Sequence, residues 1–202
     1  MTPILEVFVM QVHTLALGAY QTNCYIVQNG ERCFLIDPGY EAARILAFLE
    51  EKGLTAEAIL LTHGHFDHVG AVRELAAELD CKVYVHEGDL ALPPQFTAGA
   101  LYYTDLYKGG ITIEAAGLDV FVRHTPGHTP GSVCLLVENV LFSGDTLFAG
   151  SCGRTDLPGG DWNAIHESLR RLMRMPGELT VYPGHGQATT LEQERQYNPY
   201  VK

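Results

Sequence analysis

The feature that most constrains the fold of this chain is a group of histidines and aspartates packed into six consecutive positions. The segment follows a short apolar strand predicted over residues 58–61 and reads His63-Gly64-His65-Phe66-Asp67-His68. An extended backbone would place side chains 63, 65 and 67 on one side, because side chains alternate along a strand. Four ligand-type groups at this spacing are too crowded for one tetrahedral ion and can serve two adjacent ions. The segment therefore predicts a site for two metals.

Further ligand-type residues lie in glycine-rich turns next to predicted strands: His128, Asp145 and His185. A carboxylate can bridge two cations whereas an imidazole normally binds one, so Asp145 is the expected bridge. The predicted ligands of one ion are His63, His65, His128 and Asp145, and those of the other are Asp67, His68, His185 and Asp145. Asp67 and Asp145 are also the expected catalytic residues, and no other cofactor-binding residues are predicted. These ligands suit two Zn²⁺ ions per chain, with iron as the alternative.

A single histidine would more often be a surface residue or a hydrogen-bonded core residue, so the metal prediction depends on the whole cluster. Buried carboxylates without cations would be costly, which favours the metal interpretation. Three other histidines, His13, His86 and His166, fall on predicted strands or a helix face and are not expected to bind metal. His124 precedes the His128 turn and could support it through a hydrogen bond.

Helices alternate with strands in both halves of the chain, which predicts sheets covered by helices. Strands are predicted over residues 4–12, 24–27, 33–36, 58–61, 82–85, 119–123, 132–137, 140–143 and 179–182. Helices are predicted over residues 41–52, 69–79, 161–175 and 190–196. The stretch 92–117 is the least regular, and it could be a lid, a surface loop or a dimer contact. No change in composition marks a boundary, so we expect one domain over residues 1–202.

Composition excludes several classes of partner. The chain has 13 Lys and Arg against 24 Asp and Glu, a net charge of −11, which argues against a nucleic-acid-binding surface. Its apolar stretches are too short to span a membrane, and its first residues lack the positive charge of a secretory signal. The five cysteines are odd in number and scattered, as in a protein with reduced thiols. We therefore expect a cytoplasmic protein that binds neither membrane nor nucleic acid.

Several of these segments together are characteristic of one family. The segments are Thr62 to Gly70, Gly127-His128-Thr129-Pro130-Gly131, Gly144-Asp145-Thr146 and Gly184-His185-Gly186, preceded by Asp37-Pro38-Gly39. The chain resembles the metallo-β-lactamase superfamily over residues 20 to 199. The resemblance implies an α/β (α+β) fold, a four-layer αβ/βα sandwich with the metals in a cleft at one edge of its two sheets. It also implies a structural role for Asp37.

Within that superfamily the chain is most similar to short bacterial members of the glyoxalase II (hydroxyacylglutathione hydrolase) group. The similarity lies in Gly153 to Asp161 and Gly184 to Pro199. It implies a dinuclear thioesterase in which metal-bound hydroxide, oriented by Asp67, attacks a small hydroxyacyl-thiol such as hydroxyacylglutathione. Full-length members end in a helical domain that supplies much of the glutathione site. Only Gln187 to Lys202 follow the last ligand, so we expect no such domain, and the thiol carrier stays open.

Other functions remain as alternatives. Persulfide dioxygenases also resemble this chain and share its Gly-Arg-Thr-Asp segment; they would use one iron on His63, His128 and Asp145. Hydrolysis of another ester or lactone is a further alternative, whereas true lactamases differ in the first histidine motif. Arg154 and Asp156 are expected to form an ion pair that holds their loop, with substrate positioning as the alternative role. The acyl group, the native metal and the oligomeric state are left open.

Overall fold

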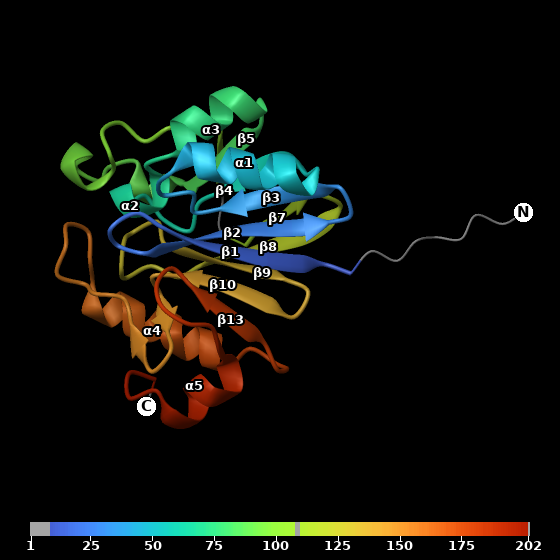
Figure 1. Cartoon of the computed structure of the whole chain (residues 1–202). Coiled ribbons are helices and arrows are strands. Elements are labelled where there is room, and N and C mark those ends of the chain that lie inside the picture. The colour runs from blue at the N-terminus through green and yellow to red at the C-terminus, as the bar shows by residue number, and fades with distance from the viewer. Residues whose placement is uncertain (1–8, 108–109, 202) are drawn as a thin grey trace, which may run out of the picture.

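Two β-sheets of six strands each pack face to face, and helices cover both outer faces (Figure 1). The computed structural model describes residues 9–107 and 110–201. The first sheet contains β1 (Gln11–Leu17), β2 (Thr22–Asn29), β3 (Arg32–Ile36), β4 (Thr55–Leu60), β5 (Lys82–His86) and β6 (Asp105–Tyr107) in that order. The pairs from β1 to β3 are antiparallel and those from β3 to β6 are parallel.

The first sheet is covered by α1 (Ala42–Lys52) and α3 (Val72–Leu79). The apolar positions of α1 recur at the spacing of one helical face, so Ala42, Ile45 and Leu49 are buried against the strands. Gly53 ends the helix in the left-handed conformation (φ 64°), where glycine is favoured because it has no Cβ.

The second sheet has the order β14-β13-β10-β9-β8-β7. Its strands are β7 (Thr112–Ala115), β8 (Leu118–His124), β9 (Val133–Val137), β10 (Val140–Gly144), β13 (Thr180–Pro183) and β14 (Thr189–Thr190). The helices α4 (Trp162–Met173) and α5 (Leu191–Tyr197) cover it, and a hairpin of β11 (Leu147–Phe148) and β12 (Ser151–Cys152) lies beside it. Asp161 begins α4 by accepting a hydrogen bond from the Ala164 amide at 2.9 Å.

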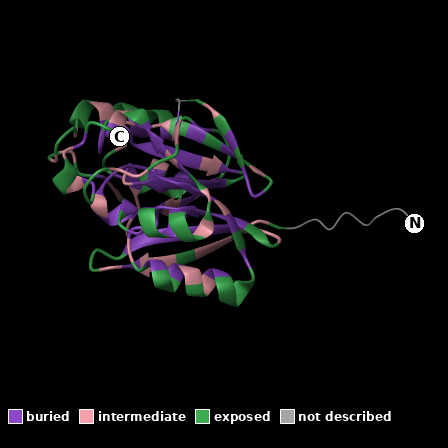
Figure 2. Cartoon of the chain, turned by 90° about the horizontal axis from the view of Figure 1, so that it is seen from above, coloured by how far each residue is buried: buried purple, intermediate pink, exposed green. Residues whose placement is uncertain are grey.

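Three apolar layers hold the four layers of secondary structure together (Figure 2). Alternation along β2 shows how: Ile26 faces α1 and α3, whereas Tyr25 and Val27 face the other sheet. From the second sheet, Val122 and Phe142 pack into the same layer between the sheets. The predicted αβ/βα sandwich is confirmed. Among the described residues no helix is long and apolar enough to cross a membrane.

Some predicted elements differ from those observed. The helix predicted over 69–79 is two helices, α2 (Phe66–Val69) and α3, because Gly70 packs directly on the Gly39 backbone. The irregular stretch 92–117 supplies β6 and β7, one edge strand for each sheet. The first described strand is β1 at residues 11–17 rather than 4–12, and residues 4–8 lie outside the described residues. Short edge strands with half-exposed side chains carry little apolar signal.

Replacement of Gly39 tests how closely the loops that carry Gly39 and Asp67 must approach one another. A Cβ atom on Gly39 would overlap the backbone carbonyl of Asp67, whereas one on Gly53 would meet nothing. We expect Gly39→Ala to lower the free energy of unfolding by about 3 kcal/mol or more through overpacking. The control Gly53→Ala should cost only about 1–2 kcal/mol, from its left-handed backbone. Urea unfolding of the metal-free protein measures both, and equal losses would contradict the close approach.

Candidate metal centre

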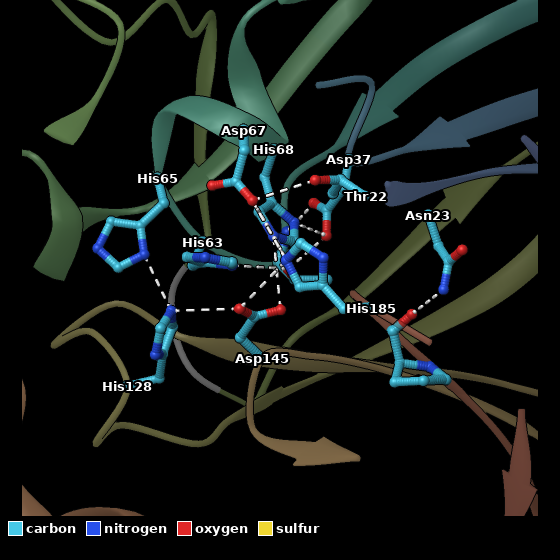
Figure 3. A network of polar contacts seen from close by, with 12 residues as sticks. Thr22, Asn23, Asp37, His63, His65, Asp67, His68, His128, Asp145 and His185 are labelled. Carbon is cyan, nitrogen blue, oxygen red and sulfur yellow. Dashed lines mark hydrogen bonds and ion pairs between the residues drawn. The ribbon is translucent and has the colours of Figure 1, made fainter. Parts of the chain in front are cut away.

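All seven predicted ligand residues lie at one edge of the sandwich, where strands of both sheets end (Figure 3). His63 follows β4, Asp145 follows β10, and His185 follows β13. Since β10 and β13 are parallel, their carboxyl ends share this edge. Hydrogen bonds join the two sheets here: the Val133 amide donates to the Thr62 carbonyl at 2.8 Å. Ligands from both sheets therefore meet across the edge.

Three overlapping groups of ligand-type side chains lie here; two of them have the composition expected for the two ions, and the third, Asp37, His63 and His68, shares one histidine with each. One nitrogen each of His63, His65 and His128 lie within 4.8 Å of one another. His65 Nδ1 and His128 Nε2 are 2.9 Å apart, and Asp145 Oδ2 is 3.5 Å from His128 Nε2. The three histidines His63, His65 and His128 are called the first group.

The second group consists of Asp67, His68 and His185, whose ligand atoms also lie within 4.8 Å of one another. Asp145 approaches this group too, at 3.4 Å from His68 Nε2 and 3.6 Å from His185 Nε2. Figure 3 shows Asp145 between the two groups, the place expected of a bridging carboxylate. The expected extended backbone ends at His65, however, and Asp67 and His68 project from the helical turn α2.

Several of the atoms that could bind a metal are buried and have no hydrogen-bond partner in the described part of the chain: His63 Nε2, His65 Nε2 and Asp145 Oδ1. A buried polar atom left without a partner costs free energy, so native proteins rarely keep several together. Bound cations would satisfy these atoms, and imidazole and carboxylate donors suit zinc or iron. The residues present therefore fit a pair of divalent ions.

Fixed oxygen atoms orient three of the imidazoles. His68 Nδ1 donates to Asp37 Oδ2 at 3.0 Å, His128 Nδ1 donates to the Arg154 carbonyl at 2.8 Å, and His185 Nδ1 donates to the Tyr20 carbonyl at 3.2 Å. In each ring this leaves Nε2 for the centre. Asp37 also accepts hydrogen bonds from the Thr62 amide and hydroxyl, as a structural aspartate would.

Asp89 is a supporting residue that the sequence reasoning missed. It ends the short 3-10 helix η1 (Glu87–Asp89) and is fully buried. Its carboxylate accepts hydrogen bonds from the Gly64 amide at 2.7 Å, the Thr129 hydroxyl at 2.9 Å and the Gly131 amide at 2.6 Å. Gly64 lies between two ligands and Thr129 follows a third, so Asp89 ties together the loops that carry the first group.

Thr22 was also missed; its hydroxyl donates to Asp67 Oδ2 at 3.1 Å. Neither Thr22 nor Asp89 stands in a distinctive motif. Each contacts a residue 25 or more positions away in the sequence, so no local pattern reveals its role.

The two groups differ in how they hold protons. Burial, together with the neighbouring histidines, lowers the pKa of His63 and lowers the pKa of His65 to about 4. Burial also acts to lower the pKa of His68, but the carboxylates of Asp145 and Asp37 outweigh it and raise that pKa to about 9. Burial acts to raise the pKa of Asp67, yet hydrogen bonding to His185 and the charge of His68 bring it well below its usual range. In the metal-free protein near neutral pH, His63 and His65 are thus neutral and His68 is protonated.

Five of the seven ligand-type residues form the floor of an open cleft of about 420 Å³, and the other two, His63 and His68, are buried. Cys152 and Arg154 line it, and Phe96 contributes from the stretch 92–117, for which a lid, a surface loop and a dimer contact are the open alternatives. Arg154 and Asp156 form the expected ion pair, with two contacts of 2.7 Å. Burial raises the pKa of Cys152, so its thiol stays protonated, consistent with an inert residue. His124 Nε2 donates to the Pro130 carbonyl at 2.8 Å and so supports the His128 turn.

The fold and this site define a class of protein. A sequence model of the metallo-β-lactamase superfamily matches residues 17–185, and the chain belongs to that superfamily. Among its relatives, the probable metallo-hydrolase YqgX of Bacillus subtilis (strain 168) is 34% identical over 95% of this chain and 98% of its own length. Hydroxyacylglutathione hydrolase GloC of Haemophilus influenzae is 34% identical with the same coverage. The superfamily and the similarity to the glyoxalase II group are thereby confirmed.

Solved structures extend these likenesses. The B3 metallo-β-lactamase BLEG-1 superposes with a TM-score of 0.90 at 35% identity, covering 95% of this chain and 100% of its own. TTHA1623, solved in a di-iron-bound form, has a TM-score of 0.84 at 42% identity, with 94% and 100% covered. ETHE1 from Myxococcus xanthus has a TM-score of 0.84 at 30% identity, with 95% and 84% covered. Similar chains thus carry different names, and one holds two irons.

Replacement of Asp89 tests whether it supports the ligands. Asp89→Asn places an amide where a carboxylate now accepts three hydrogen bonds. We expect the affinity for metal to fall about 10- to 100-fold and the free energy of unfolding to fall by about 1–3 kcal/mol. Chelator competition and urea unfolding measure these, with Asp119→Asn, at an exposed position of β8, as the control. Unchanged metal affinity in Asp89→Asn would refute the supporting role.

Proton release on metal binding tests the difference between the groups. A metal can bind His68 only after its proton leaves, and because its pKa is raised to about 9 the proton competes at every lower pH. Affinity for the ion on the second group should therefore rise with pH up to about 9. The ion on the first group should respond less, since His63 and His65 are already neutral. Calorimetric zinc titrations near pH 7 and near pH 9, in buffers of different ionisation enthalpy, count the protons released. Equal release for both ions would contradict this assignment.

Proposed function

We propose that this chain is a dinuclear zinc thioesterase that hydrolyses a small hydroxyacyl-thiol, such as hydroxyacylglutathione. The observation that carries the proposal is the pair of ligand groups sharing Asp145, with buried donor atoms unsatisfied, on the floor of a cleft. The name of the relative GloC supports the substrate, and the di-iron form of TTHA1623 supports a two-metal site.

The first group and Asp145 would hold one ion, and the second group and Asp145 the other. When bound, two such ions supply a water that is acidic enough to attack at neutral pH and a Lewis acid that polarises the thioester carbonyl. The chain itself must hold its ligands still. Asp37, Asp89 and the carbonyl of Arg154 provide this positioning through the hydrogen bonds described above.

Asp67 is the residue we assign to orienting the attacking water. Its Oδ2 accepts a hydrogen bond from the Thr22 hydroxyl and lies 3.2 Å from His185 Nε2, and these two contacts fix the plane of the carboxylate. Because its pKa is lowered, Asp67 stays ionised and acts as a hydrogen-bond acceptor. Its other oxygen, Oδ1, is the atom that would accept a hydrogen bond from the water.

The leaving group favours a thioester over an amide. A thiol has an ordinary pKa of about 8.5, so the thiolate leaves near neutral pH without a strong proton donor. Since the similar BLEG-1 structure is that of a metallo-β-lactamase, a β-lactam belongs among the compounds tested.

The proposed setting is the cytoplasm, with a small molecule rather than nucleic acid or membrane as the partner. All five cysteines are free, as expected of a reducing compartment. The net charge of −11 disfavours binding to phosphate backbones.

Removal of one ligand tests the proposed activity. We expect His63→Ala to lower kcat for a hydroxyacyl thioester by at least about 100- to 1,000-fold, the cost of losing transition-state charge stabilisation. Its bound metal should also fall below that of wild type. His13→Ala, on the half-exposed strand β1, is the matched control and should keep full activity and metal content.

Metal analysis accompanies the assays, which compare thioester, persulfide and β-lactam on zinc- and iron-loaded protein. Full activity of His63→Ala with full metal content would overturn the assignment. Oxygen uptake with a persulfide at about one iron per chain, without thioester turnover, would instead identify a persulfide dioxygenase.

A further inference from the structure

We propose that the cleft selects thioesters whose acyl group and thiol carrier are uncharged and apolar, with Phe148 and Phe96 as the residues that set this preference. The inference rests on the proposed thioester hydrolysis and names the substrate class more narrowly. It ranks a neutral thiol carrier above glutathione.

Apolar side chains from separate parts of the chain form the walls of the cleft. Tyr20 comes from the turn before β2, Phe66 from α2, Phe96 from the 3-10 helix η2 (Pro94–Phe96), Phe148 from β11, and Leu157 from the loop after β12. Each of these side chains remains partly or largely open to solvent. A ligand that covers them removes apolar surface from water, which favours binding.

The aromatic rings lie directly beside the ligand groups. Tyr20 and Phe66 meet edge to face with centroids 5.4 Å apart, and Phe66 is the neighbour of Asp67. The Phe148 ring lies 6.3 Å from the His185 ring. A substrate whose carbonyl reaches the floor must therefore place its adjoining groups against aromatic carbon.

The walls of the cleft, apart from the ions proposed on its floor, offer an anionic carrier little cationic charge. Apart from histidines, Arg154 is the one cationic side chain among the described residues that line it. Both Nε and Nη2 of Arg154 are engaged by Asp156 at 2.7 Å. No described residue is hydrogen-bonded to Nη1, which leaves a place for one carboxylate. A carrier with two carboxylates, such as glutathione, would then have to displace Asp156, place its second carboxylate on an apolar wall, or leave it in solvent where it gains no contact. Loss of hydration without a partner makes the second choice costly.

Paired substrates test the preference. The mandeloyl and lactoyl thioesters are both 2-hydroxyacyl compounds and differ in one phenyl ring, and each is made on neutral N-acetylcysteamine and on glutathione. With the zinc-loaded protein we expect kcat/KM for mandeloyl-N-acetylcysteamine to exceed that for mandeloylglutathione by about 10-fold or more, the effect of one unpaired buried charge.

Variants connect the preference to the walls. Phe148→Ala should lower kcat/KM for mandeloyl-N-acetylcysteamine by about 10-fold, the effect of losing one apolar contact surface. It should change the lactoyl compound by less than about 3-fold, because that acyl group lacks the ring. Phe96→Ala should act in the same direction. Phe121→Ala, an exposed phenylalanine on β8 that does not line the cleft, is the matched control.

A binding measurement keeps the inference separate from turnover. A non-hydrolysable thioether of N-acetylcysteamine carrying a phenyl group should bind the metal-free protein more tightly than its glutathione counterpart, and Phe148→Ala should weaken the binding of both, because both carry the ring. Equal or higher kcat/KM for the glutathione thioester, or equal binding of the two thioethers, would overturn the inference alone. If no thioester is hydrolysed at full metal content, the proposed function fails, and the thioether titration then decides whether the cleft prefers a neutral ligand.

Discussion

The position of the whole metal centre depends on one buried carboxylate, that of Asp37. It follows β3, and its hydrogen bonds hold both the amide and the hydroxyl of Thr62, at the end of the parallel neighbour β4. A carboxylate only 2% exposed persists in an interior when its oxygens are hydrogen-bonded. Because the ligand segment begins at the next residue, these bonds fix where His63 starts, and a further bond to Asp37 aims His68.

Close backbone approach allows ligands from the two sheets to meet. The Asn23 amide donates to the Gly184 carbonyl at 2.8 Å, which brings β2 to the end of β13. A Cβ atom on Gly184 would overlap Asp145 Oδ1 and press on His68. The glycine next to His185 therefore provides the space that the carboxylate between the groups occupies. Asp89 adds a second connection, since its three hydrogen bonds cross from the segment after β4 to the turn before β9.

The ligand residues of the site could be predicted from the sequence more fully than the residues that hold those ligands in place. The ligand-type residues stand in short glycine-rich segments after apolar strands, so local pattern reveals them. Asp89 and Thr22 act across 25 and 45 positions, and nothing local distinguishes a buried carboxylate or hydroxyl from an exposed one. The break between α2 and α3 was missed for the same reason, because it results from contact with Gly39 rather than from the helix's own residues. The edge strands β6 and β7 were too short to show a recognisable alternation of apolar and polar residues.

The floor of the cleft and its walls are built mostly from different kinds of structure. Most floor residues follow strands whose register is fixed by two sheets, whereas most wall residues come from a turn, the 3-10 helix η2 and the β11–β12 hairpin; α2 contributes Asp67 to the floor and Phe66 to a wall. Side chains on such connecting segments can be exchanged without shifting any strand. The scaffold can therefore diverge in substrate while its ligands stay in place, and residues 94–97 and 147–152 are the natural targets for directed evolution of new selectivity.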